Sequence, residues 1–341
     1  FVIKVNLISL IFGFTFNTLI LKFVNNKNAK FIYGSSFVLL VICIGLLLVL
    51  KEDIIKYIYL FKMLYSLGEV AYAGPLEMVI MGANTQKTSS SYQANLNILS
   101  SIATILTPIF SGYIIENFSY NILFIILAFE AFVVILTSTR ITKFYIEDRK
   151  LNIKEFWNKS KKYKHMKNIY KCMFYRRISA QGAITDLLPI ILFLKLNSEL
   201  SVGTYDSVFA ILSICSLSLL KLVNKKNIKK RFYIPFSILI FLSTLTLVFI
   251  PGFVTFLIYY ICMKTFAVVI ESESCSAVYQ SINNKELSKY NREHDIVFNV
   301  YMFIGQVISY SMAYILYTYF YNANILSVVV SILMFFLIIS C

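Results

Sequence analysis

Long apolar runs, separated by short polar or basic stretches, dominate the amino-acid sequence. Three of the clearest runs are 37–50 (FVLLVICIGLLLVL), 122–137 and 325–340. Such runs approach the roughly 20 residues with which a helix crosses a bilayer. The strands of a membrane barrel would alternate apolar and polar residues, and the sequence shows no such alternation. The pattern therefore predicts a bundle of spanning helices, in which each segment satisfies its own backbone hydrogen bonds.

The apolar pattern predicts about eleven spans, each near the length needed to cross a bilayer. Composition agrees, because 58% of the 341 residues are apolar and only 14% are charged, against roughly 25% charged in globular proteins. We therefore expect an all-α, polytopic integral membrane protein embedded in a lipid bilayer. The predicted spans are 1–21, 31–50, 54–82, 92–116, 120–138, 178–196, 204–220, 232–250, 252–278, 295–319 and 324–341.

Basic residues gather in alternate connecting segments, and the largest group lies in 140–177. Cytoplasmic loops are enriched in Lys and Arg, so these segments are expected at the cytoplasmic face of a cell membrane, with residue 1 outside. The cations of 140–177 are interpreted as a solvated cytoplasmic face, and no nucleic-acid partner is expected. The Lys-rich part of this linker is expected to lie along anionic headgroups.

A short basic connector occurs twice. Residues 21–30 read LKFVNNKNAK and residues 220–229 read LKLVNKKNIK, which agree at seven of ten positions. With this offset, the spans before 138 correspond to those after about 201, whereas 178–196 has no counterpart. The simplest interpretation is a protein of two similar six-helix halves, with 11 of 12 helices present and one expected before Phe1. The predicted domains are an N-terminal half (1–139), a linker (140–177) and a C-terminal half (178–341).

Charged residues inside the spans repeat with nearly the same offset. Lys62 and Glu69 are seven residues apart, and so are Lys264 and Glu271, with 202 residues between the equivalent members. Seven residues are almost two helical turns, which puts Lys and Glu on one face about 10 Å apart. Charges within a bilayer are costly, so they are candidates for functional sites.

These features resemble the major facilitator superfamily, whose basic loops follow the second and eighth helices, where the two connectors fall. The stretch TPIFSG, with Pro108 and Gly112, is similar to a helix-kink signature of exporters in that family. The first loop departs from the family pattern, since Thr18, Lys22 and Asn25 stand near the places of its Gly, Asp and Gly, so the Asp of the usual latch is replaced. The resemblance implies two six-helix halves around a cavity, and secondary transport by alternating access.

By this resemblance, both Lys–Glu pairs line the cavity, where they would serve substrate binding or proton coupling. The alternative interpretation is that each pair is structural and holds the halves together. The primary candidates are Lys62, Glu69, Lys264, Glu271 and Asp186, and the secondary candidates are Glu77, Glu273, Gln181 and Glu130. For Glu130, the favoured interpretation is a structural carboxylate.

Enzymatic motifs are not found in the sequence. It holds two His, no phosphate-binding Gly-rich loop and no assembled hydrolase triad. We expect no enzyme activity, cofactor or metal; the six Cys are interpreted as reduced packing residues. The predicted function is a monomeric, proton-coupled transporter of a small molecule, with efflux as the favoured direction. Uptake, or a receptor or scaffold of transporter ancestry, is the alternative, and zwitterions, peptides, organic anions and cationic drugs all fit the cavity charges.

Overall fold

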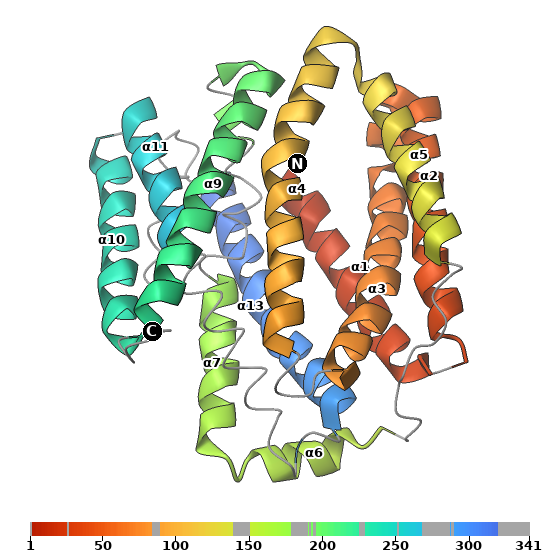
Figure 1. Ribbon diagram of the computed structural model, residues 1–341, viewed down its shortest axis with the longest axis vertical. Coiled ribbons are helices and arrows are strands. Elements are labelled where there is room, and N and C mark those ends of the chain that lie inside the picture. The colour runs from red at the N-terminus through yellow and green to blue at the C-terminus, as the bar shows by residue number, and fades with distance from the viewer. Residues whose placement is uncertain are drawn as a thin grey trace. The chain divides into compact units, whose positions relative to one another are not determined.

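Helices make up every regular element that is described. The computed structural model describes residues 2–25, 27–83, 89–138, 151–178, 190, 192–193, 196–224, 229–250, 252–267, 287 and 290–319. The helices of this part of the chain are shown in Figure 1. The prediction of an all-α protein is confirmed, and the spans 324–341 and most of 178–196 lie outside the described residues.

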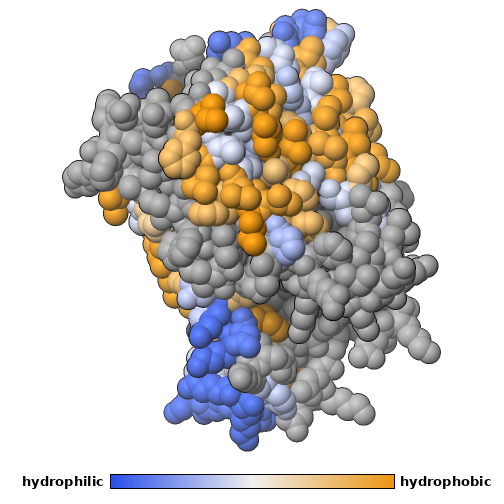
Figure 2. Space-filling view, turned by 90° about the vertical axis from the view of Figure 1, so that its left-hand side faces the viewer, coloured by the Kyte–Doolittle hydropathy of each residue, from blue (hydrophilic) through white to orange (hydrophobic). Residues whose placement is uncertain are grey.

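Apolar side chains cover much of the described part of the face shown in Figure 2. Val49, Phe31 and Phe249 are 79%, 78% and 78% exposed. Four described segments are long and apolar enough to cross a membrane: Val2–Phe23, Ala29–Leu50, Tyr120–Thr137 and Arg292–Ile315. Apolar surface of this extent is stable against lipid rather than water.

Most helices begin and end within a few residues of the predicted spans. In the first part of the chain these helices are α1 (Val2–Phe23), α2 (Ala29–Leu50), α3 (Ile58–Ala83), α4 (Ser89–Asn117) and α5 (Tyr120–Ser138). In the second part they are α9 (Glu199–Asn224), α10 (Lys229–Phe249), α11 (Phe253–Cys262) and α13 (Asn291–Tyr319).

Four elements were not expected from the apolar pattern. A 3-10 helix, η1 (Lys51–Tyr57), precedes α3 and begins at Lys51, whose φ is +46°. A π-helical turn, η2 (Met263–Ala267), follows α11 directly. The predicted linker contains two helices, α6 (Ile153–Ser160) and α7 (Lys164–Ile178). The linker is therefore partly ordered as helix rather than being only a loop.

The chain forms two compact units, and α4 and α13 each contribute residues to both. The first unit consists of Phe1–Asn97, Asn117–Lys159 and Glu286–Val300. The second unit consists of Ile98–Glu116, Ser160–Lys285 and Tyr301–Cys341.

In the first unit, α3 packs against α1 and α2, and α2 packs against α5. The connector between α1 and α2 is held by asparagine side chains, which explains why Asn recurs there. Asn25 Oδ1 accepts the Lys27 and Asn28 amides at 2.9 and 3.0 Å, and Asn28 Oδ1 accepts the Asn25 amide at 2.7 Å. Asn side chains commonly stabilise turns in this way.

In the second unit, α9 and α10 pack against η2, and α10 packs against α11. The second half of α4 lies against the start of α9, where two glycines permit unusually close approach. A Cβ built on Gly203 would lie 2.1 Å from the Pro108 carbonyl oxygen, and one on Gly112 would lie 2.8 Å from the Glu199 carbonyl oxygen. Small residues let helix backbones approach in membranes.

Candidate functional site

In the first unit, the predicted residues Lys62 and Glu69 lie on α3 with a tyrosine between them. The Lys62 ammonium lies 5.6 Å from the centre of the Tyr65 ring. The Tyr65 hydroxyl is hydrogen-bonded to the Glu69 carboxylate. An ammonium over an aromatic ring gains about 0.5–2 kcal/mol, depending on how far it is desolvated. The three residues therefore form one Lys–Tyr–carboxylate array along the helix.

The position of this array follows from how α3 packs. Ser66 is buried, and its hydroxyl forms a 2.7 Å hydrogen bond with the Ser9 hydroxyl of α1. Gly68 is also buried, and a Cβ added to it would lie 3.5 Å from the Cβ of Leu39 on α2. These small residues fix α3 against its neighbours, while the Glu69 side chain remains exposed on the surface of the unit.

In the second unit, a similar array surrounds Lys264. Its ammonium lies 5.5 Å from the centre of the Tyr260 ring. The Tyr260 hydroxyl donates a 2.5 Å hydrogen bond to Asp206 Oδ1 on α9. Tyr260 is fully buried between Phe209 and Phe256. The ring centres of Phe209 and Tyr260 are 4.5 Å apart in a T-shaped arrangement, and those of Phe256 and Tyr260 are 5.9 Å apart in a stacked one. The tight packing holds the phenol in one orientation toward Asp206.

Lys264 itself lies in the π-helical turn η2. Its backbone carbonyl accepts a 2.6 Å hydrogen bond from the Ser213 hydroxyl of α9. A π turn shifts the helical hydrogen-bond pattern by one residue, and such turns are frequent at functional sites. The Ser213 hydroxyl supplies a donor from a neighbouring helix at the place where that pattern changes.

Asp206 is not among the residues predicted from the sequence, although it lies seven residues into α9. The predictions relied on charges repeated between the halves, and the residue 202 positions before Asp206 is Lys4, which is not a carboxylate. The cost of a carboxylate in a spanning helix was the signal that could have found it. The lysines of the two arrays, Lys62 and Lys264, thus stand at equivalent positions of the repeat, whereas the carboxylates, Glu69 and Asp206, do not.

The remaining predicted residues are only partly described. Glu130 has an exposed side chain on α5. Glu77 lies on α3, but its side chain is outside the described set. Four candidates lie outside the described residues altogether: Asp186, Gln181, Glu271 and Glu273. Whether Glu271 or Asp186 joins Lys264 therefore stays a prediction.

Pro108 and Gly112, predicted as a helix-kink motif, lie at the close contact between α4 and α9. Pro108 cannot donate a backbone hydrogen bond. Ser207 of α9 donates its hydroxyl to the Ile105 carbonyl oxygen of α4 at 2.6 Å. The Glu116 carboxylate accepts the Leu200 amide at 3.2 Å, at the first turn of α9, where a negative charge is favoured. The motif therefore joins two helices of the second unit.

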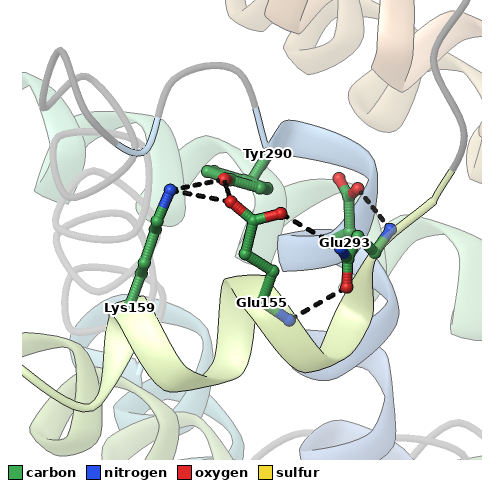
Figure 3. Close-up of polar contacts among 5 residues, drawn as sticks. Glu155, Lys159, Tyr290 and Glu293 are labelled. Atoms are coloured by element: carbon green, nitrogen blue, oxygen red, sulfur yellow. Dashed lines mark hydrogen bonds and ion pairs between the residues drawn. The ribbon is translucent and has the colours of Figure 1, made fainter.

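A second polar cluster ties the linker helix α6 to the first residues of α13 (Figure 3). The Lys159 ammonium donates to Glu155 Oε1 and to the Tyr290 hydroxyl, both at 2.8 Å. Tyr290 also donates to Glu155. The hydrogen bond to Glu155, followed by that to Tyr290, raises the pKa of Lys159 above its ordinary value. Glu293 accepts the Asn152 amide at 2.9 Å, which closes the other side of the cluster.

The same end of α13 reaches the end of α1. The Arg292 guanidinium donates to the Leu21 carbonyl at 2.8 Å and to the Lys22 carbonyl at 3.3 Å. The last carbonyls of a helix lack intrahelical donors and carry partial negative charge. A cation from α13 therefore caps α1, where the family pattern has an Asp-based latch. Ile296 of α13 packs beside Leu21 in the same apolar cluster.

No metal-binding group of three or more His, Cys, Asp or Glu is found within the described part of the chain. The contacts that the structure shows in the two arrays are hydrogen bonds and contacts between an ammonium and an aromatic ring.

The chain was compared with protein families, curated sequences and solved structures. A family model described as Major Facilitator Superfamily matches residues 5–312. No curated protein sequence matches the chain significantly.

Solved structures with the same fold include transporters. A bacterial homologue of the iron transporter ferroportin, in an outward-facing state with soaked iron, has a TM-score of 0.65 and 12% identity, covering 99% of this chain and 87% of that one. The same homologue in an inward-facing state has a TM-score of 0.62 and 12% identity, over 99% and 88%. The E. coli fucose:proton symporter has a TM-score of 0.56 and 12% identity, over 99% and 88%. These identities establish the fold alone.

Proposed function

The chain belongs to the major facilitator superfamily, and from this premise we propose that it moves a small solute across a cell membrane by proton-coupled alternating access. Members of this family are multi-pass membrane transporters and not enzymes. The proposal covers the coupling ion, the direction of transport and the residues involved. It also includes the halves 1–139 and 178–341, joined by a cytoplasmic linker.

The observation that carries the proposal is the Lys–Tyr–carboxylate array in each unit. Lys62 and Lys264 stand 202 residues apart, and each lies 5.5–5.6 Å from the centre of a tyrosine ring on its own helix. Each of these tyrosines is hydrogen-bonded to a carboxylate, Glu69 or Asp206. Charged side chains in spanning helices are costly to insert into a bilayer, so two such arrays favour a functional role over a chance arrangement.

The chemistry of these arrays suits proton exchange. A carboxylate that has a phenol donor and a nearby ammonium changes its preference for a proton when either neighbour moves or water enters. Alternating access supplies such a change, because the environment of the site differs between states. We propose Glu69 and Asp206 as proton carriers, with Glu271 and Asp186 as further members, and Lys62 and Lys264 as substrate or switching cations.

Export is the proposed direction, because Pro108 and Gly112 match part of the exporter signature. Uptake along the same gradient is the alternative, and the E. coli neighbour is a symporter. Both directions use the same carboxylates, so the assignment of Glu69 and Asp206 does not depend on which is correct.

Transport by whole cells tests the proposal. Uptake and efflux of labelled amino acids, sugars and dyes would be measured with and without a protonophore, in cells with the parent, Glu69→Gln or Asp206→Asn. We expect protonophore-sensitive movement of one substrate class by the parent, and its loss in both variants. Asp53→Asn is the matched control, since it neutralises an exposed carboxylate of η1. Unchanged, protonophore-sensitive transport in both variants would refute the coupling role.

A further inference from the structure

The outer face of the linker helix α7 carries exposed lysines. Lys167 and Lys171 are one helical turn apart and both exposed, and Lys161 and Lys162 are exposed in the turn before the helix. We call these four residues the basic face. All four lie in the second unit. Hydrophilic side chains gather at the lower edge in Figure 2, at the height at which α7 begins in Figure 1.

The opposite side of α7 is buried against α13. Met166, Tyr170 and Met173 are 1%, 2% and 3% exposed. The Tyr170 ring stacks on Tyr301 of α13 at 5.2 Å, and a Cβ on Gly305 would lie 2.6 Å from the Phe174 carbonyl oxygen. Because α7 is anchored this closely, the basic face is held at a fixed depth relative to α13.

That depth follows from the length of α13. Its 29 residues extend about 43 Å at 1.5 Å per residue, whereas the hydrocarbon core is about 30 Å thick. The four residues 292–295 are Arg, Glu, His and Asp, and the segment 296–319 holds no charged residue. The surplus of the helix therefore lies at its first residues, and Tyr301 falls near the boundary of the hydrocarbon. Tyr170, stacked on Tyr301, brings Lys167 and Lys171 to the level of the headgroups.

The charged residues along this part of the chain are of one sign. No Asp or Glu occurs between Glu155 and Asp186 in the sequence. Tyr163 adds a half-buried aromatic side chain directly after Lys162, and tyrosines are enriched where protein meets headgroups. Lysines near an anionic leaflet are attracted to its lipids.

From these observations we propose that the basic face is a binding surface for anionic phospholipids of the cytoplasmic leaflet. It holds lipid phosphates beside α7 and so retains anionic lipid next to the junction of α7 and α13. A requirement to fix topology explains the number of basic residues in the linker, but not the exposure of Lys167 and Lys171 on a helix that is anchored at headgroup depth.

The association of spin-labelled lipids with the full chain tests this surface. The protein would be placed in nanodiscs of equimolar phosphatidylcholine and phosphatidylglycerol, and the motionally restricted fraction of each spin-labelled lipid measured. We expect the parent to prefer phosphatidylglycerol, and added salt to reduce the preference. Lys167→Gln/Lys171→Gln and Lys161→Gln/Lys162→Gln should each reduce it, by up to about fivefold for each lysine removed.

The matched control is Lys51→Gln/Lys56→Gln, which removes two exposed lysines from η1. This variant should retain the parent's preference, and Lys167→Arg/Lys171→Arg should retain it as well. The proposal is overturned if the parent shows no preference, if the basic-face variants match the parent, or if the η1 control loses as much. Displacement of the labelled lipid by inorganic phosphate, beyond that caused by chloride at the same ionic strength, would also overturn it, because the surface would then recognise free phosphate. None of these outcomes depends on the transported substrate.

Discussion

At the scale of single residues, the two arrays show how a spanning helix accommodates charge. Each lysine lies beside an aromatic face, and each tyrosine uses its hydroxyl to hold a carboxylate. A ring offers an ammonium partial compensation for lost water without fixing it in an ion pair. This kind of contact is compatible with the substrate or switching role that we propose for the two lysines.

Asp206 and Tyr260 can be separated by two substitutions. Tyr260→Phe removes the donor and leaves a carboxylate without its 2.5 Å hydrogen bond, a loss of about 1–3 kcal/mol for a buried group. Asp206→Asn keeps an oxygen acceptor for the Tyr260 hydroxyl but removes the charge. We expect Tyr260→Phe to lower the midpoint of thermal inactivation, and Asp206→Asn to change it less.

Transport should rank Tyr260→Phe and Asp206→Asn in the opposite order to thermal stability. Asp206→Asn should lose protonophore-sensitive transport, whereas Tyr260→Phe should slow it. Similar stability losses in both variants, with transport intact in Asp206→Asn, would indicate a purely structural pair.

The contact of Gly203 with Pro108 makes a second residue-scale prediction. An added Cβ at Gly203 would lie 2.1 Å from the Pro108 carbonyl oxygen, so Gly203→Ala must push α9 away from α4. Overpacking of this kind costs about 1–3 kcal/mol or more. Thermal inactivation in detergent would show a lower midpoint for Gly203→Ala. Gly45→Ala is the control, because nothing lies within 4 Å of its added Cβ. Equal midpoints would mean that the two helices separate at little cost.

At the scale of elements, the linker helix α6 is fixed to α13 by side chains rather than by an apolar stripe alone. Phe156 is fully buried beside Tyr290 and His294, at 5.9 and 6.0 Å between ring centres. Around it, Glu155 and Lys159 bond to Tyr290, and Asn152 bonds to Glu293. A short helix of eight residues is not stable alone, so α6 depends on these contacts.

Removing the Tyr290 hydroxyl should loosen α6. Tyr290 is 1% exposed and donates to a carboxylate, so Tyr290→Phe should forfeit about 1–2 kcal/mol of docking. Amide hydrogen exchange in α6 would then accelerate roughly tenfold if local opening limits it. Tyr59→Phe, at an exposed tyrosine of α3, should leave that exchange unchanged. Equal protection in Tyr290→Phe would show that Phe156 alone holds the helix.

The elements also show which parts of the fold the sequence could predict. Spans such as 31–50 and 120–138 were located closely, since an apolar run of bilayer length has one stable form in lipid. The helices α6 and α7 were missed because they are short and basic, and they fold on contacts with α13 from more than 120 residues away. Likewise, η2 depends on a donor from Ser213, which no local pattern reveals.

The candidate site divides in the same way. The pairing of Lys62 with Glu69 followed from helical spacing, and the structure adds Tyr65 between them. Asp206 depends on contact between α9 and α11, which the sequence does not specify. Comparison of the two halves of the sequence found Lys62 and Lys264 because they repeat. It missed Asp206, because the equivalent position of the other half has no carboxylate.

At the scale of the whole molecule, the alternation of basic segments predicts a single orientation in the membrane. The connector at Lys27 and the linker at Lys162 are assigned to the cytoplasm, and Lys56 in η1 to the outside. All three side chains are exposed, so each can report its location. Lys56 also pairs with Asp53 at 2.6 Å, an exposed contact worth little in stability.

Cysteine labelling tests this orientation in a background without the six native cysteines. Lys27→Cys and Lys162→Cys should react only with reagents that cross the membrane. Lys56→Cys should also react with an impermeant reagent in intact cells. Reaction of Lys27→Cys with the impermeant reagent would reverse the orientation, and with it the assignment of the basic face to the cytoplasmic leaflet.

The fluorescence of the whole protein comes from one position when tryptophan is excited selectively. Trp157 is the only tryptophan in the chain, and it lies in α6, directly after the buried Phe156. The emission of a half-buried indole shifts with the polarity around it, so the colour of the emitted light reports whether α6 stays docked on the start of α13. A transporter of this size thus carries a built-in optical probe of its linker, against which substrates, lipids and pH can be screened without a label.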